Sequence, residues 1–156
     1  MSELEDLLIE AMNSELEAQQ FYVNAAEKAQ SQAGKNFFNE LAEFEQNHYN
    51  KVKQIFDSLE SIANVPETEE IHNIKHINSE IEGEFEPNKD EIITVINMAI
   101  DAEKMAQERY DTIADMLDDQ KSKTIFDNLA QDERNHQKIL EDELYHLSNK
   151  GTIIWE

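Results

Sequence analysis

Two four-residue segments with the same pattern, Glu45-Gln46-Asn47-His48 and Glu133-Arg134-Asn135-His136, lie 88 residues apart in this chain. Each places a Glu and a His three residues apart, a spacing that puts both side chains on one face of a helix. At the same offset, and without a gap, the sequence also pairs Ala11 with Ala99, Glu15 with Glu103, Ala18 with Ala106, Gln19 with Gln107, Tyr22 with Tyr110, Phe38 with Phe126, Leu41 with Leu129 and Ala42 with Ala130. The sequence therefore predicts two helical hairpins with the same inner face.

The composition is typical of one almost entirely helical domain spanning residues 1–156. The chain has only 3 Gly and 2 Pro, while good helix formers abound. Its length is sufficient to close a hydrophobic core. Because it has no Cys, disulfides, thiolate nucleophiles and thiolate-held zinc or iron–sulfur sites are excluded.

The charge argues against two classes of partner. A formal net charge of −22 repels nucleic acid and anionic membranes, so neither is expected to bind. The plainest interpretation of the charge is a solvated acidic surface, which would also concentrate metal cations. No basic segment followed by an apolar run is visible at the N-terminus, and no apolar stretch is long enough to span a bilayer, so a cytoplasmic protein is predicted.

Apolar periodicity predicts an all-α four-helix bundle made of two antiparallel hairpins. Ser2 followed by Glu5 has the pattern of a capping box, and Asn88 with Glu91 resembles a second helix start. The segment between the hairpins contains both prolines and is long enough to cross the bundle. The expected helices cover residues 3–29, 35–63, 88–117 and 122–148, with a crossover at 64–87 and a tail containing Trp155 that packs on the bundle.

Six positions of the apolar stripes carry ionisable residues instead. Glu15 precedes the first turn by about as many residues as His48 follows it, and helices rise equally per residue, so the two side chains should face each other at one level. The repeat imposes the same arrangement on the second hairpin. The candidate site residues are Glu15, Glu45, His48, Glu103, Glu133 and His136.

Four carboxylates in a helical core repel one another and lose hydration, at a cost of several kcal/mol per ion. Two divalent cations would balance their charge, with two neutral imidazoles completing the ligand set. Oxygen-rich ligands with some imidazole suit iron or manganese better than copper or a closed zinc site. The sequence thus predicts a two-metal centre, with ions ~3.5–4 Å apart.

Isolated features have plainer interpretations. A single Glu-x-x-His in an acidic protein is usually a surface feature, and the metal hypothesis depends on two copies in register. His72 and His76 have helical metal-binding spacing, but their acidic, irregular segment favours a solvated pair. Tyr22 and Tyr110 have two equal interpretations, hydrogen-bonding partners of ligands or ordinary core aromatics. Asp132 either orients a ligand or is exposed, and exposure is favoured.

The combination of Glu15-x6-Tyr22 with Glu45-x-x-His48, repeated as Glu103-x6-Tyr110 with Glu133-x-x-His136, resembles the ferritin-like diiron-carboxylate superfamily. The segments 15–22 and 25–29 are similar to the first helix of rubrerythrin-like proteins. The resemblance covers about residues 3–148. It implies two iron ions, replaceable by manganese or zinc, with Glu45 and Glu133 bridging them. Glu15 with His48, and Glu103 with His136, would be the terminal ligands.

The chain departs from these relatives at several points. Full-length rubrerythrins carry a rubredoxin-like domain with four cysteines, so an external electron donor is implied here. Ala106 stands where those enzymes have an additional Glu. The ligand set is also similar to that of bacterioferritin, but Gln46 replaces the haem-ligating Met, so no haem is expected. Without a clear fifth helix a cage is not expected, and the resemblance suggests a homodimer.

Three functions follow as hypotheses. The leading one is a rubrerythrin-like diiron redox protein that reduces hydrogen peroxide or dioxygen, with all six site residues forming the catalytic centre. The second is a ferroxidase or iron-handling protein, with ferrous iron as substrate and no cage. The third is a bundle that binds metal without catalysis.

Overall fold

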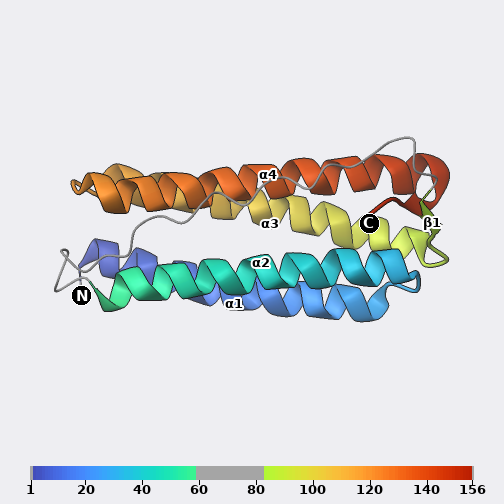
Figure 1. The fold of residues 1–156 in the computed structure, drawn as a ribbon, viewed down its shortest axis with the longest axis horizontal. Helices are drawn as coiled ribbons and strands as arrows, with labels where there is room; N and C mark the ends of the chain where they lie inside the picture. The colour runs from blue at the N-terminus through green and yellow to red at the C-terminus, as the bar shows by residue number, and fades with distance from the viewer. Residues whose placement is uncertain (1, 59–82, 156) are drawn as a thin grey trace.

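The computed structural model describes residues 2–58 and 83–155, and this part of the chain forms four helices and two short strands (Figure 1). The helices lie side by side along one long axis, as the predicted four-helix bundle requires. Their bounds are Glu3–Lys28 for α1, Gln32–Asp57 for α2, Lys89–Met116 for α3 and Gln120–Lys150 for α4.

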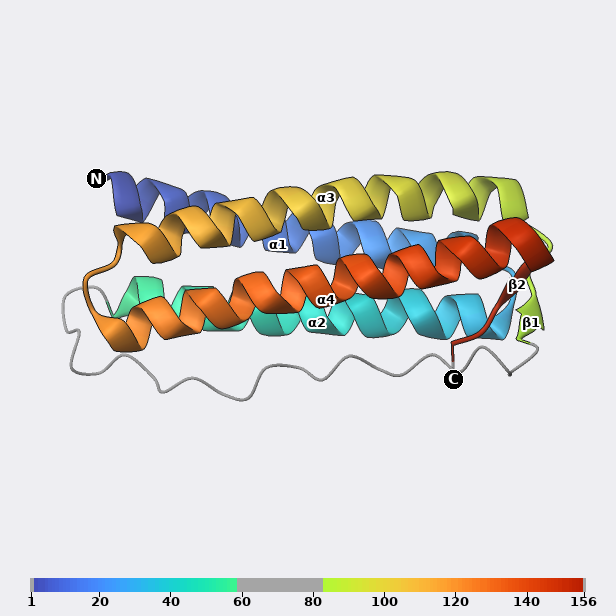
Figure 2. The ribbon, with the colours of Figure 1, turned by 90° about the horizontal axis from the view of Figure 1, so that it is seen from above.

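The two hairpins stack as two layers. Helix α1 lies antiparallel to α2 in one layer, and α3 lies antiparallel to α4 in the other (Figures 1 and 2). The closer contact between the layers runs along α1 and α3. The C-terminal end of α2 and strand β1, just before α3, lie at opposite ends of the bundle. The chain thus changes ends between residues 58 and 83, as the predicted crossover requires. His72 and His76 lie outside the described residues.

The start of α2 differs from the sequence prediction by three residues. Ser31 caps this helix, because its Oγ accepts a hydrogen bond from the Gly34 amide at 2.9 Å. The carboxylate of Glu84 accepts the next two free amides, those of Gln32 and Ala33, each at 2.9 Å. Gly34 lies in the first turn of α2 and does not interrupt the helix. A Cβ on Gly34 would lie 2.7 Å from Glu86 Oε1, so the glycine permits a close approach.

The end of the predicted 64–87 crossover contains a strand that the sequence did not indicate. Strand β1 (Glu84–Phe85) pairs antiparallel with β2 (Thr152–Ile153), which follows α4. Gly151 at the C-terminal cap of α4 has φ of 70°, so the chain reverses there in the left-handed conformation that glycine favours. Two-residue strands give no hydrophobic alternation, which is why sequence periodicity missed them.

The C-terminal tail, from β2 onward, packs on the chain's own bundle, as expected. Ile153, Ile154 and Trp155 are buried. The indole Nε1–H of Trp155 donates to Glu40 Oε2 at 2.7 Å, and its ring contacts Phe37 with 5.1 Å between centroids. The tail therefore joins the end of α4 to α2 of the other hairpin. None of the described helices is long and apolar enough to cross a membrane.

Two hydrophobic clusters fill the bundle, one toward each end. One contains Phe37, Phe38, Leu41 and Ile96, and the other contains Leu8, Val52, Ile113 and Phe126. Along every helix the ionisable stripe positions fall between the residues of these two clusters. Apolar side chains therefore enclose the candidate site from both ends and keep its dielectric constant low.

Glu143 on α4 is fully buried beneath the tail, where its Oε1 accepts the Ile154 amide hydrogen at 3.1 Å. Burial raises the pKa of this carboxyl to about 7, and the nearby charge of Asp142 adds to the shift, although backbone hydrogen bonds from Ile154 and Trp155 oppose it. The folded protein therefore holds the Glu143 proton at pH values where an unfolded chain has lost it.

Glu143→Gln should remove one component of the pH dependence of stability. The folded-state pKa of about 7 lies above the ordinary 4.5, so this group's stabilising contribution is present at low pH and is lost as pH rises through 7. We expect the free energy of unfolding of wild type, relative to the variant, to fall by roughly 2–3 kcal/mol between about pH 5 and pH 8. Urea unfolding measures this difference. Glu141→Gln, an exposed neighbour on α4, is the control, and equal behaviour of the two variants would contradict the assignment.

Candidate metal centre

All six candidate residues point into the middle of the bundle and are buried. None is more than 3% exposed. Glu15 comes from α1, Glu103 from α3, and each Glu-x-x-His pair from α2 or α4. Because antiparallel helices rise equally per residue, these positions lie at one level of the bundle.

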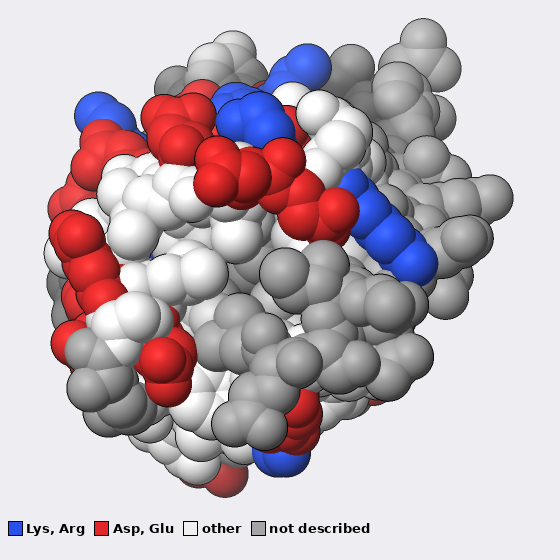
Figure 3. Space-filling view, turned by 90° about the vertical axis from the view of Figure 1, so that its left-hand side faces the viewer, with Lys and Arg blue, Asp and Glu red and all other residues white. Residues whose placement is uncertain are grey.

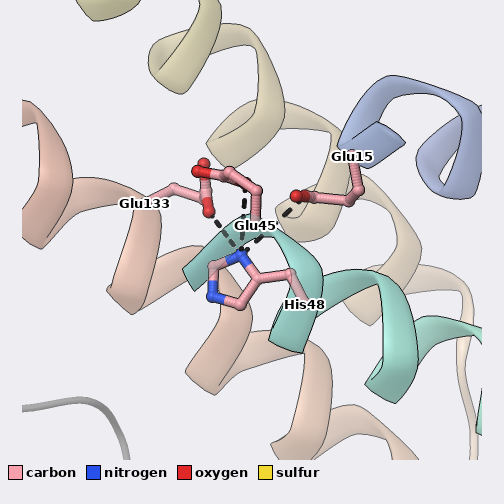
Figure 4. A group of neighbouring side chains, drawn as sticks. All are labelled: Glu15, Glu45, His48 and Glu133. Carbon is pink, nitrogen blue, oxygen red and sulfur yellow. Dashed lines mark ion pairs between the residues drawn. The ribbon is translucent and has the colours of Figure 1, made fainter. Parts of the chain in front are cut away.

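Glu15, Glu45, His48 and Glu133 form one group (Figure 4). The Nδ1 atom of His48 lies 2.7 Å from Glu133 Oε1, 3.7 Å from Glu45 Oε2 and 3.8 Å from Glu15 Oε1. The carboxylates come from three different helices and converge on the Nδ1 atom of the imidazole ring. Their ligand atoms lie within 4.8 Å of one another.

Glu45, Glu103, Glu133 and His136 form a second group of the same kind. The Nδ1 atom of His136 lies 3.5 Å from Glu103 Oε2, 3.6 Å from Glu45 Oε1 and 3.8 Å from Glu133 Oε1. Glu45 and Glu133 belong to both groups. The two imidazole rings lie nearly parallel, with centroids 5.7 Å apart.

The donor atoms of this cluster fit a pair of cations. Buried polar atoms normally have a hydrogen-bond partner, yet within the described residues several here have none: Glu15 Oε2, Glu45 Oε1, Glu103 Oε2, Glu133 Oε2 and both His136 nitrogens. Ligands held about 2.1 Å from one ion lie about 3 Å from each other, close to the spacings in both groups. Carboxylate oxygens and neutral imidazole are the donors that iron and manganese accept.

Two tyrosines hold the outer carboxylates in place. The Tyr22 hydroxyl donates to Glu103 Oε1 at 2.6 Å, and the Tyr110 hydroxyl donates to Glu15 Oε1. Each bond joins α1 to α3, so each tyrosine orients a carboxylate of the other hairpin. Of the two interpretations of these tyrosines, the structure supports the hydrogen-bonding one.

Mutual repulsion separates the pKa values of the four carboxyls. Burial raises the pKa of Glu45 well above its ordinary range, and the charges of Glu103 and Glu133 add to this. Burial and the charge of Glu103 likewise raise the pKa of Glu133. For Glu15 and Glu103 burial also acts upward. Close contacts with the neighbouring carboxyls and imidazoles outweigh the effect of burial, so the pKa values of both Glu15 and Glu103 are lowered. Without metal, the two shared carboxyls therefore hold protons that metal must displace.

The sequence favoured an exposed Asp132, but this side chain is buried, with only 1% of it exposed. Its Oδ2 lies 3.1 Å from His48 Nε2. This contact raises the pKa of His48 well above its ordinary range, against the lowering effect of burial. The signal lay in the repeat, because Asp132 occupies the position equivalent to Phe44, which contacts the other imidazole.

A cavity of about 280 Å³ opens between α1 and α3 and reaches all four carboxylates. Ala18 and Ala106, equivalent positions of the repeat, are among its walls, together with Phe21, Met105 and Arg109. Small side chains at equivalent positions leave room there for a ligand to approach the carboxylates.

This all-α bundle has the ferritin-like fold, and its buried pair of Glu/His groups is of the kind that can hold two metal ions. The sequence profile of the rubrerythrin family matches residues 6–144, so the chain belongs to the rubrerythrin family. A hypothetical protein from Pyrococcus furiosus has a similar structure, with a TM-score of 0.73 and 30% sequence identity, covering 94% of this chain and 90% of that one. No curated protein matches the chain.

Metal binding at neutral pH should release protons. Because the pKa values of Glu45, Glu133 and His48 are all raised in the metal-free protein, divalent ions must displace the protons these groups hold. We expect about one to two protons per chain to be released at pH 7, and the metal affinity to fall as pH is lowered. Calorimetric titration in two buffers of different ionisation enthalpy measures the release. Glu45→Gln should reduce it and the exposed Glu43→Gln should not, whereas release independent of Glu45 would contradict the assignment.

Proposed function

We propose that this protein is a diiron redox protein that reduces hydrogen peroxide or dioxygen, with electrons supplied by an external donor. The observation that carries the proposal is that six buried side chains form two potential metal-binding groups with two residues in common. The six are Glu15, Glu45, His48, Glu103, Glu133 and His136. The rubrerythrin family and the unpartnered donor atoms support iron as the metal.

The proposed ligands divide by position. Glu45 and Glu133 would help to hold both ions, since both groups contain them, while Glu15 with His48 and Glu103 with His136 would each hold one ion. Two ferrous ions held there would supply the two electrons that, with two protons, reduce hydrogen peroxide to two molecules of water. Tyr22 and Tyr110 keep the outer carboxylates oriented, and the apolar clusters on both sides exclude water.

The oxidant would approach through the cavity between α1 and α3. Within the described part of the chain, the residues lining this cavity include the four carboxylates and neither histidine. A molecule in the cavity therefore meets the cluster from the carboxylate side. On the far side, Phe44 stacks on His136 and Asp132 contacts His48.

Stopped-flow mixing of the diferrous protein with peroxide, and separately with dioxygen, tests the proposal. We expect oxidation at least about tenfold faster than that of free ferrous iron, because the ligands hold both ions in a dry site. Glu45→Gln should slow it and exposed Glu43→Gln should not. Oxidation no faster than that of free iron would refute the redox function.

Ferrous-iron oxidation and handling is the second candidate function, and the acidic surface favours it. Acidic side chains gather along the upper and left parts of the bundle end seen in Figure 3, with some basic ones beside them, and the whole chain carries a formal charge of −22. Such a surface raises the local concentration of cations. Iron binding beyond two ions per chain during aerobic loading would support this function, whereas a plateau at two with continuing peroxide turnover supports the first.

Ala106→Leu should slow the reaction without removing the metals. Ala106 lines the cavity and is not a proposed ligand, so a larger side chain narrows the approach to the carboxylates. We expect two ions still to bind, while the rate constant for peroxide falls about tenfold. Asn97→Leu, an exposed position of α3 that does not line the cavity, should react like wild type. An unchanged rate in Ala106→Leu would mean that peroxide reaches the site by another path.

A further inference from the structure

The internal repeat relates the two halves of the metal centre, and most of their contacts are repeated as well. One half is Glu15 with His48 and the other is Glu103 with His136. In both, a tyrosine of the opposite hairpin bonds the terminal carboxylate, and the imidazole Nδ1 faces the shared carboxylates. A perfect repeat would give two equivalent metal positions.

The repeat breaks at the residue behind each imidazole. Asp132 of α4 approaches His48 across the bundle, with 3.1 Å between Oδ2 and Nε2. The equivalent residue of the first hairpin, Phe44 of α2, approaches His136 instead, and its ring stacks on the imidazole with centroids 5.1 Å apart and planes at 24°. One imidazole thus has a buried carboxylate behind it and the other has a benzene ring.

This difference acts on the nitrogen that faces the metal position. Asp132 accepts the Nε2–H of His48, which keeps that proton on Nε2, so Nδ1 is the nitrogen that binds metal once metal displaces its own proton, and the contact makes Nδ1 a stronger donor. The Nε2 atom of His136 is buried and has no hydrogen-bond partner within residues 2–58 and 83–155. Among the described residues no carboxylate accepts a hydrogen from this nitrogen, so His136 lacks the support that Asp132 gives to His48.

We infer that the two halves of the centre bind divalent metal unequally, and that the Glu15–His48 half, with Asp132 as its positioning residue, fills first. The inference rests on the metal-binding part of the proposed function and is independent of its redox part. The ion bound by Glu103 and His136 is then the one lost first to a chelator. The centre therefore has a retained ion and an exchangeable one.

Half-site variants of the full chain measure each affinity separately. His136→Ala leaves the Glu15–His48 half, and His48→Ala leaves the Glu103–His136 half. Cobalt(II) is titrated into each metal-free variant and followed by visible absorption, with far-UV circular dichroism to verify folding. We expect the first variant to bind its ion about 10 to 100 times more tightly. Equal affinities, or the reverse order, would overturn the inference.

Positions 44 and 132 are equivalent in the repeat, so exchanging their residue types tests the role of Asp132. In the His136→Ala background, Asp132→Phe should weaken binding about 10- to 100-fold and Asp132→Asn by less, because an amide oxygen still accepts the Nε2–H. In the His48→Ala background, Phe44→Asp should strengthen binding, since it supplies the missing carboxylate. The cobalt absorption spectrum should change only in the half whose imidazole is affected.

Wild-type protein carrying both ions provides a test that needs no ligand substitution. With zinc in both halves, a chelator should remove one ion faster than the other, and Asp132→Asn should bring the two rates together. Release at a single rate in wild type, unchanged by Asp132→Asn, would overturn the inference even if peroxide is reduced. Unequal release without any reaction toward peroxide would uphold it while refuting the redox function.

Discussion

The structure depends on how the bundle accommodates four carboxylates at its centre. Glu15, Glu45, Glu103 and Glu133 are nearly inaccessible to water, and like charges at this spacing in a low-dielectric interior repel strongly. In the metal-free protein the cost is met by splitting their protonation, with the pKa values of the shared carboxyls raised. Two divalent cations would offset the same charges without protons, and metal binding would then be linked to pH and to stability.

The packing around the four carboxylates keeps them close together. Apolar clusters on both sides fix the helices, so the ligand side chains have little freedom to separate. Their hydrogen bonds link the hairpins to each other. Tyr22 and Tyr110 connect α1 with α3, and the contact of His48 with Asp132 connects α2 with α4. The same residues that orient the ligands therefore also hold the two layers together.

At one end of the bundle, a second group of acidic residues accepts hydrogen bonds from backbone amides and lies outside the candidate metal centre. Glu84 in β1 and Glu86 just after it accept amide hydrogens at the start of α2, where the helix dipole favours negative charge. Burial acts to raise the pKa of Glu86, but hydrogen bonds from the Ser31 hydroxyl and from the amides of Gln30, Ser31 and Asn88 lower it below its ordinary value. Because β1 pairs with β2, this capping also anchors the tail that carries Trp155.

The sequence by itself determined the four helices, the pairing of the hairpins and the six residues that converge, because a repeat at a fixed offset and a helical period require no knowledge of long-range contacts. It did not determine what lies behind the ligands. Asp132 and Phe44 occupy equivalent positions in the repeat, but each contacts the imidazole of the other hairpin. Only the packing of the two layers decides that contact. The start of α2, the two short strands and the burial of Glu143 depend in the same way on residues distant in sequence, so tertiary structure alone decided them.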